Sequence, residues 1–97
     1  SRLCKDEERE VRKVVATRLP PFALHMLAGD PEPEVRAIVA ERALPELAIR
    51  LLNDEEWWVR LAAVNNAPVE FLQTLLDDPE LEIREAVLAR LADTQQD

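Results

Sequence analysis

Glycine, aromatic residues and alternating apolar patterns are scarce in this sequence. Its 97 residues contain one glycine, two phenylalanines, two tryptophans and no tyrosine. No run of useful length alternates apolar and polar residues, as a half-buried β-strand would. Hydrophobic residues still make up 47% of the chain, which is enough to fold despite 33% charged residues and argues against disorder. The composition therefore predicts an all-helical protein.

Cysteine, histidine and long apolar runs are also nearly absent. A single cysteine, Cys4, excludes an internal disulfide framework and favours a reducing, cytoplasmic setting. No stretch approaches the ~18 apolar residues of a membrane span and none resembles a signal peptide, so we expect no membrane association. With one histidine and no clustered ligands, the chain predicts neither an ordinary nitrogen or sulfur metal site nor a catalytic nucleophile–base pair.

Acidic residues outnumber basic ones, and the two kinds are unevenly distributed. The formal net charge is -8. Residues 1–29 contain six basic and four acidic residues, whereas residues 30–97 contain six basic and sixteen acidic residues. Nucleic-acid binding normally needs a basic face, so this balance argues against a nucleic-acid partner. It permits an acidic end that meets a basic protein surface.

Similar residues recur along the chain with a period of 24. Four positions of the period form complete columns: Asp6, Asp30, Asp54 and Asp78; Glu8, Glu32, Glu56 and Glu80; Val11, Val35, Val59 and Ile83; Arg12, Arg36, Arg60 and Arg84. A fixed period of this length predicts a tandem array. We divide the chain into a lead-in, 1–5, and a repeat domain, 6–97, with units 6–29, 30–53, 54–77 and a shortened fourth, 78–97.

Each unit is expected to fold as two helices. The first is predicted to begin at the column aspartate (Asp6, Asp30, Asp54 or Asp78), which is a favourable N-cap residue. Its apolar residues follow the spacing of one buried helix face. Prolines then stop the first helix and open a second one, which is short enough to be 3₁₀. The unit ends on Gly29, Asn53 or Asp77, residue types that tolerate the left-handed conformation after a helix.

A unit of this size cannot bury its apolar faces alone, so neighbouring units must stack. The array therefore predicts an α-helical solenoid. Solenoids need end caps with a polar outer face, but the first unit follows the lead-in with no polar capping helix. We expect its N-terminal side to expose apolar surface, on which an upstream domain, further repeats or another chain would pack.

The stretch DPEPEVRAIVAERALPELAIRLLN (30–53) resembles the leucine-rich repeat variant family, and the resemblance covers residues 6–92. It implies 24-residue units that alternate an α-helix with a 3₁₀-helix in a right-handed superhelix without strands. HEAT, armadillo and TPR units are longer, at ~34–47 residues. Family members often carry an N-terminal four-cysteine domain that holds a 4Fe–4S cluster, and they are associated with nitrogen fixation. A cluster usually needs four thiolates, so no cofactor is expected in this chain, and Cys4 is a candidate ligand only with an upstream cysteine domain.

The arginine column has two interpretations. It could be a ladder of anion-binding groups along one edge, or each arginine could pair with the glutamate four residues earlier in its own unit. Exposed pairs of that kind contribute ~0.3–0.5 kcal/mol each, which suits a structural role. We therefore predict a structural ladder: Glu8–Arg12, Glu32–Arg36, Glu56–Arg60 and Glu80–Arg84. A second column, Arg18, Arg42 and Arg90, is interrupted by Asn66 and is expected to form a solvated face.

Trp57 and Trp58 stand side by side where sister units carry other residues. The column of Trp57 also contains Arg9, Pro33 and Leu81, so an apolar residue has precedent there. The column of Trp58 otherwise contains Glu10, Glu34 and Glu82. Because exposed tryptophan is favoured at interaction hot spots, we predict that Trp57 and Trp58 contact a partner. The alternative is that Trp58 covers a local gap or folds over a neighbouring unit.

The sequence thus favours a non-catalytic helical-repeat scaffold that mediates protein–protein interaction. The Trp57/Trp58 edge and the acidic C-terminal two-thirds would make the contact. An alternative is the repeat part of an iron–sulfur accessory or redox protein linked to nitrogen fixation, with the cluster domain upstream of this chain. A third hypothesis, a base-processing DNA enzyme built on helical repeats, is disfavoured by the net charge of -8.

Overall fold

The computed structural model describes the backbone of residues 5–95 and the side chains of residues 7–94. Over that range all regular elements are helices, with η marking the 3₁₀ type: α1 (Lys5–Arg18), η1 (Pro21–Leu27), α2 (Pro33–Arg42), α3 (Pro45–Leu51), α4 (Trp57–Val64), η2 (Val69–Leu75) and α5 (Leu81–Gln95). The helices α2, α4 and α5 begin 24 residues apart, and so do η1, α3 and η2. The secondary structure therefore follows the sequence period.

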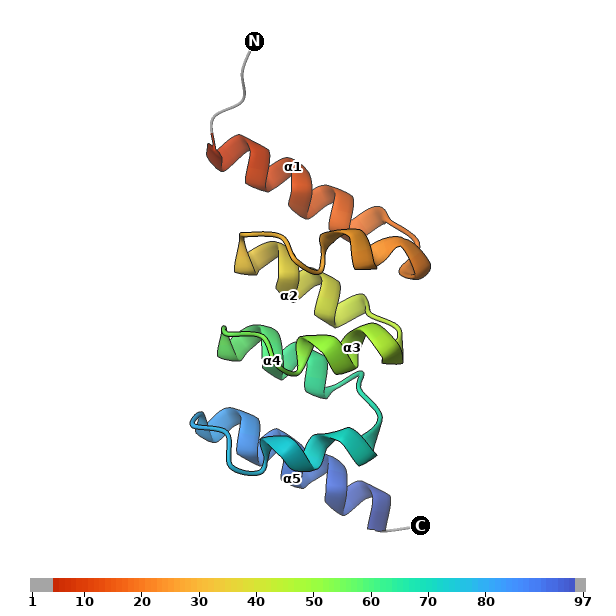
Figure 1. Ribbon diagram of the computed structural model, residues 1–97, viewed down its shortest axis with the longest axis vertical. Helices are drawn as coiled ribbons and strands as arrows, with labels where there is room; N and C mark the ends of the chain where they lie inside the picture. The colour runs from red at the N-terminus through yellow and green to blue at the C-terminus, as the bar shows by residue number, and fades with distance from the viewer. Residues whose placement is uncertain (1–4, 96–97) are drawn as a thin grey trace.

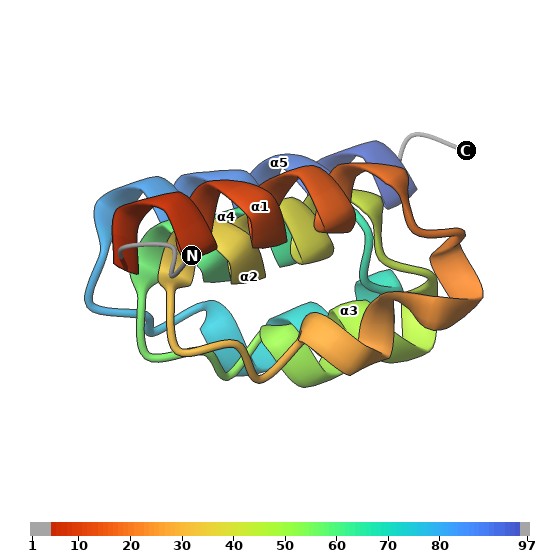
Figure 2. The same cartoon turned by 90° about the horizontal axis from the view of Figure 1, so that it is seen from above.

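The first and second helices of the units form two layers. α1 lies at one end of the long axis and α5 at the other (Figure 1). The view along that axis shows α1, α2, α4 and α5 in one row and η1, α3 and η2 in the other (Figure 2). Successive first helices pack directly, α1 on α2, α2 on α4 and α4 on α5, and the molecule measures 55 × 27 × 15 Å. The predicted all-α solenoid of 24-residue repeats is confirmed.

Prolines set the boundaries between the layers. η1, α2 and α3 begin on Pro21, Pro33 and Pro45, where the fixed φ suits a first helical residue and the missing N–H has no partner to lose. Leu44, directly before Pro45, is extended with φ -68° and ψ 159°, because proline disfavours a helical conformation in the preceding residue. The second helix is 3₁₀ in η1 and η2 but α-helical in α3.

The core runs the length of the molecule as columns of equivalent residues. Three such columns are fully buried: Val35, Val59 and Ile83; Val39, Ala63 and Val87; Leu24, Ala48 and Leu72. Each unit contributes one residue to a column, so a unit on its own has no core. Burial therefore depends on stacking, as the repeat length requires.

The ends of the units differ from the prediction. Among the described residues no backbone φ is positive, including that of Gly29. The chain leaves each second helix through a right-handed turn, in which the N–H of Asp30, Asp54 and Asp78 donates to the carbonyl three residues earlier at 3.2 Å. A Cβ added to Gly29 would meet nothing within 4 Å. The backbone therefore does not require glycine here, which explains why glycine, asparagine and aspartate share this position.

Candidate functional site

Three arginines of the repeat reach across to the next unit. Nε of Arg12, Arg36 and Arg60 donates to Oδ2 of Asp30, Asp54 and Asp78 at 2.8, 2.8 and 2.9 Å. Nη2 of the same arginines donates to Oδ1 of the same carboxylates at 3.3, 3.1 and 3.1 Å. Such two-pronged contacts are the strong form of a charge-assisted hydrogen bond. Since the aspartate side chains are only 4–7% exposed, each pair holds one unit firmly against the next.

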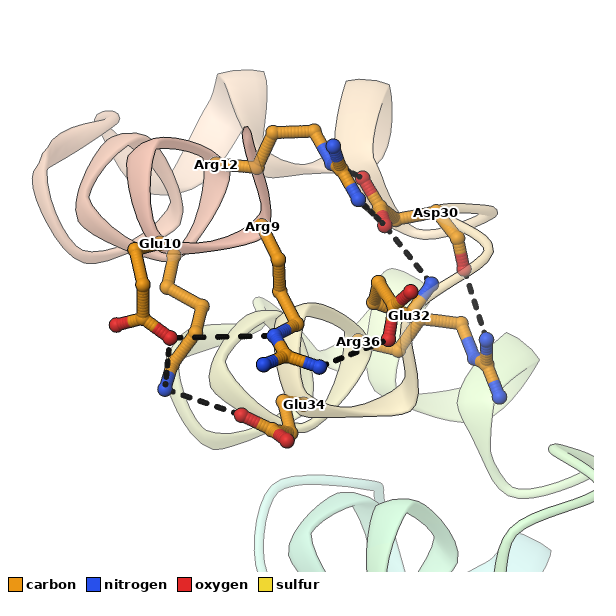
Figure 3. A network of polar contacts seen from close by, with 8 residues as sticks. Arg9, Glu10, Arg12, Asp30, Glu32, Glu34 and Arg36 are labelled. Carbon is orange, nitrogen blue, oxygen red and sulfur yellow. Dashed lines mark hydrogen bonds and ion pairs between the residues drawn. The ribbon is translucent and has the colours of Figure 1, made fainter. Parts of the chain in front are cut away.

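Two of these arginines, and Arg84 in the last unit, also bind the backbone of their own units. Nη1 of Arg36 donates to the carbonyl of Asp30 at 2.8 Å, and Nη1 of Arg60 donates to that of Asp54 at 2.8 Å. Arg84 makes the equivalent contact with Asp78 at 2.6 Å. Arginine and aspartate therefore alternate as one continuous chain of contacts along the array. Figure 3 shows its first links, from Arg12 through Asp30 to Arg36.

The carboxylate partners differ from those that the i, i+4 spacing predicts. The predicted pairs were Glu8–Arg12, Glu32–Arg36, Glu56–Arg60 and Glu80–Arg84, within one unit, whereas Arg12, Arg36 and Arg60 pair with aspartates of the next unit. Glu32 lies instead 3.8 Å from Nη1 of Arg9. A buried aspartate competes better for the guanidinium than a solvated glutamate, because water and salt screen its charge less. The hydrogen bond that Arg36 donates to the Asp54 carboxylate accordingly raises the pKa of Arg36.

The column aspartates also stand earlier than the predicted N-cap position. α2 begins at Pro33 with Glu32 in the N-cap place. Asp30 lies two residues before Glu32, and its Oδ1 accepts the backbone N–H of Glu32 at 2.9 Å. Asp54 and Asp78 make the same contact two residues on, at 3.0 Å. This is an Asx turn, which aims each carboxylate at the arginine of the preceding unit. Asp6 is the second residue of α1, and its side chain lies outside the described part.

A second set of donors closes the ends of the first helices. Nη1 of Arg42 donates to the carbonyls of Ala16 and Leu19 at 2.8 and 2.6 Å. Asn66, one unit later, donates to Ala40 and Glu41 at 2.8 and 2.9 Å, and Arg90 contacts Val64 and Ala67 in the same manner. The last carbonyls of an α-helix have no partner within the helix, so these side chains satisfy them from the following unit. The prediction of a solvated face is therefore wrong for Arg42 and Arg90, which make a second inter-unit contact, whereas Arg18 is exposed as predicted. Asparagine replaces arginine in this column because both donate N–H groups.

Both tryptophans lie at the start of α4 and are partly buried. Trp58 packs against the hydrophobic core. Its place in the repeat is that of Glu34, whose Oε2 accepts a hydrogen bond from Nζ of Lys13 in the preceding unit at 3.1 Å. Ala37 stands at the position of Lys13 one unit later, so this position offers no ammonium group. An apolar pair, Ala37 and Trp58, thus takes the place of the ion pair.

The first inter-unit contact carries a wider network of charges. Lys13 bonds Glu10 at 3.4 Å as well as Glu34, and Arg9 lies 3.9 Å from Glu10 (Figure 3 labels Arg9, Glu10 and Glu34). The hydrogen bonds that Lys13 donates to Glu34 and Glu10 raise the pKa of Lys13, and the bond that Glu34 accepts lowers the pKa of Glu34. These groups are at least partly exposed to solvent, so water screens their attraction and each contributes little to stability.

The described residues contain no arrangement with evident catalytic chemistry. Among the described side chains, residues 7–94, no three histidine, cysteine, aspartate or glutamate residues gather as metal ligands. No described helix combines the length and apolar character needed to cross a membrane. A shallow groove of about 660 Å³ lies between the turns of successive units, and its charged lining includes Asp30, Arg36 and Asp54, which are already paired with one another or with Arg12. Cys4, the candidate cluster ligand, lies outside the described residues.

The fold and these contacts define a class: a helical-repeat solenoid whose units are joined by arginine–aspartate pairs. The family model of the leucine rich repeat variant matches residues 9–32 and 57–80. A solved structure titled as a leucine-rich repeat variant with a novel repetitive protein structural motif matches with a TM-score of 0.80 and 50% sequence identity. The match covers 89% of this chain but spans only 36% of the other. No curated protein matches. The chain belongs to the leucine-rich repeat variant family.

Proposed function

We propose that the chain is a non-catalytic helical-repeat scaffold that binds another protein. The supporting observation is the contrast between its polar and apolar groups. The buried aspartates are committed to contacts between units, whereas ten large hydrophobic side chains among the described residues are exposed, with Phe22 at 75%. Exposed apolar side chains concentrated on a small protein favour a role in association.

We assign the central contact to the start of α4, where Trp57 and Trp58 follow two glutamates. The side chain of Glu55, two residues before Trp57 in the chain, is 86% exposed, and both indoles are partly exposed. A partner that offers a basic side chain next to an apolar one would match both features. Because Trp58 packs against the core, Trp57 is the better candidate for direct contact.

Affinity capture from the source organism tests this assignment when wild type, Trp57→Ala and Phe71→Ala are compared. Phe71 is a matched control, since it is an exposed aromatic residue in a different helix, η2. The captured protein would then be purified and titrated against each variant by calorimetry. We expect Trp57→Ala to weaken binding at least about tenfold, as for a hot-spot residue, and Phe71→Ala to leave it unchanged. Equal affinities would refute the site, and a lack of any specific partner would refute the proposed function.

The iron–sulfur alternative stays a prediction, because its candidate ligand, Cys4, lies outside the described residues. The expected covering of the N-terminal side also belongs to the proposal. Val11, Val14 and Val15 on α1 are exposed and would receive a domain, further repeats or another chain.

A further inference from the structure

The helix α4 is apolar on every side. Its one charged residue, Arg60, pairs with Asp78 of the next unit, and the side chain of Arg60 is only 12% exposed. A surface helix normally carries polar residues opposite its buried face, and a helix that is hydrophobic all round is normally buried. Four of the apolar residues are nevertheless partly exposed: Trp57, Trp58, Leu61 and Ala62. α4 therefore has the composition of a covered helix but an uncovered side.

One side of the first helices points away from the second layer, and we call it the outer face. Successive helical residues are rotated by about 100°, so positions i, i+3, i+4 and i+7 share one side of a helix. In α2 the side that begins at Glu34 lies opposite the fully buried Val39 and Ala40, which belong to the core between the two rows of Figure 2. On α2, α4 and α5, and directly after α4, the outer face consists of residues none of which is buried: Glu34, Ala37, Ile38 and Glu41; Trp58, Leu61, Ala62 and Asn65; Glu82, Glu85, Ala86 and Ala89.

The centre of the outer face does not result from where the array begins or ends. α4 packs on α2 and on α5, and α2 packs on α1 as well as on α4 (Figure 1). Both helices thus have one unit before them and one after them. Their outer residues, among them Ile38 and Leu61, nevertheless stay partly exposed. A further repeat at either end is therefore not what would cover the apolar side of α4.

Carboxylates stand on both sides of this apolar centre. Glu41 on α2 and Glu82 and Glu85 on α5 are exposed, and the outer face of α2, α4 and α5 contains no lysine or arginine. Arg36 and Arg60 of the same helices pair instead with aspartates of the next unit. A surface that is apolar at its centre and negative at its border matches one that is apolar at its centre and basic at its border.

We propose that the outer face binds an amphipathic α-helix of another protein. The apolar stripe of that helix lies on Ile38 and Leu61, and its lysine or arginine residues meet Glu41 and Glu82. Trp57 stands one helical turn before Leu61, so the same helix reaches the indole. This contact rests on the proposed function, because the partner expected at Trp57 is the protein that supplies the helix.

A helix fits this surface better than an extended peptide does. The described residues form no strand, so they offer no sheet edge to which an extended peptide could add. A row of helices instead presents ridges and grooves of side chains into which another helix packs, with axes about 8–10 Å apart. A helix of about 14 residues, roughly 21 Å long, spans the row from α2 to α5.

Calorimetric titration of this chain with synthetic peptides tests the proposal. The probe is a helix-stabilised peptide of about 14 residues, with leucine at positions i, i+3, i+4 and i+7 and lysine elsewhere. One control peptide has the same composition in scrambled order, and a second has glutamate in place of lysine. We expect only the probe to bind, because it alone combines an apolar stripe with a basic border.

Leu61→Lys should weaken binding of the probe at least about tenfold, because it removes apolar surface and adds a like charge. The first unit carries Lys13 at this position, so the fold tolerates lysine there, and circular dichroism checks that it does. Leu44→Lys is the matched control, since it makes the same change at an exposed leucine directly before α3 in the second layer. It should bind the probe like the wild type.

A second pair of variants tests the border without altering the apolar centre. Glu41→Gln with Glu82→Gln should weaken binding about 2- to 5-fold at low salt and leave it unchanged at high salt, because salt screens exposed charges. Glu46→Gln with Glu70→Gln removes the same number of exposed carboxylates from the second layer and should have a smaller effect.

Equal binding of the probe and the scrambled peptide would overturn the proposal, and so would equal affinities of Leu61→Lys and Leu44→Lys. A captured partner that needs Trp57 but binds Leu61→Lys like the wild type would overturn it while leaving the proposed function in place. Self-association that Leu61→Lys abolishes would assign the outer face to a second copy instead. A full-length gene product that fails to bind a probe bound by these 97 residues would assign it to a segment of the same polypeptide.

Discussion

Removal of one carboxylate from the arginine–aspartate contacts tests whether they hold the units together. Asp54→Ala leaves the guanidinium of Arg36, which is 9% exposed, without its ion pair at 2.8 Å, and it removes the acceptor for the N–H of Glu56. An uncompensated buried charge costs about 3–5 kcal/mol. Arg36 keeps its bond to the carbonyl of Asp30, so we expect the lower end, about 3 kcal/mol. That is a large share of the roughly 5–15 kcal/mol by which proteins are stable.

Urea denaturation followed by circular dichroism measures this loss. With a slope of about 1–3 kcal/mol per molar, the midpoint should fall by about 1–3 M. Asp30→Ala should cost less, about 1–2 kcal/mol, because its partner Arg12 is 32% exposed and can be hydrated. Glu55→Ala is the control: this carboxylate lies 3.9 Å from Arg36 but is 86% exposed, so its loss should stay within about 0.5 kcal/mol.

Two results would refute this account of the pairs. One is an Asp54→Ala variant that loses no more stability than Glu55→Ala. The other is a larger loss for Asp30→Ala than for Asp54→Ala, which would show that burial of the arginine does not set the cost. The double variant Arg36→Met with Asp54→Ala should recover part of the loss, because it leaves no buried charge without a partner.

Three further predictions follow from single positions. Gly29→Ala should raise the free energy of unfolding by about 0.4–1 kcal/mol in urea denaturation, since φ is not positive and the added Cβ is free; a decrease would show a hidden constraint. Trp58→Ala should lower the free energy of unfolding by about 2–3 kcal/mol, because Trp58 packs against the core. Leu44→Ala, at an exposed site, should change it by no more than about 0.5 kcal/mol. Equal losses for the two variants would mean that Trp58 does not pack. Glu34→Gln should lower the free energy of unfolding at neutral pH only. Because the hydrogen bond with Lys13 lowers the pKa of Glu34, the stabilisation by the ionised carboxylate is fully present above the unfolded pKa of about 4.3. It disappears as the pH falls through the lower pKa of the folded state. Thermal unfolding of this variant and the wild type should converge at acid pH, and a gap that persists there would contradict the pairing.

The architecture could be predicted from the sequence because a repeat places the same residue in the same environment several times. The apolar columns of Val35 and Val39 identify the buried face of the first helices, and the structure buries both columns fully in α2, α4 and α5, whereas their α1 members, Val11 and Val15, are exposed. The prolines mark where the chain passes to the second layer, and Pro21 and Pro45 do begin second helices. These signals are local, so they do not require knowledge of how one unit lies on the next.

The contacts between units could not be predicted in the same way. An i, i+4 spacing can be recognised within one helix, and it predicts Glu32 as the partner of Arg36. The observed partner, Asp54, becomes a neighbour only when the units stack, and a turn then directs its carboxylate. Arg42 binds backbone carbonyls, which every residue has, so its acceptors leave no mark in the sequence. The one available signal was that the arginine and aspartate columns are both complete, at a constant separation of 18 residues.

The position of Trp58 shows that neighbouring units are matched as pairs. Within its own column of the repeat, Trp58 stands where the other units carry glutamate, which by itself suggests a surface that binds a partner. Across the contact between units, both positions change together. The first contact has Lys13 and Glu34 at these positions, and the next contact has Ala37 and Trp58 there. Trp58 and Ala37 both pack against the hydrophobic core, so burial of apolar surface replaces the ion pair of the preceding unit. Trp58 therefore has a sufficient structural reason to be present, whereas that exchange leaves its neighbour Trp57 without one, and Trp57 is where a binding partner should be sought.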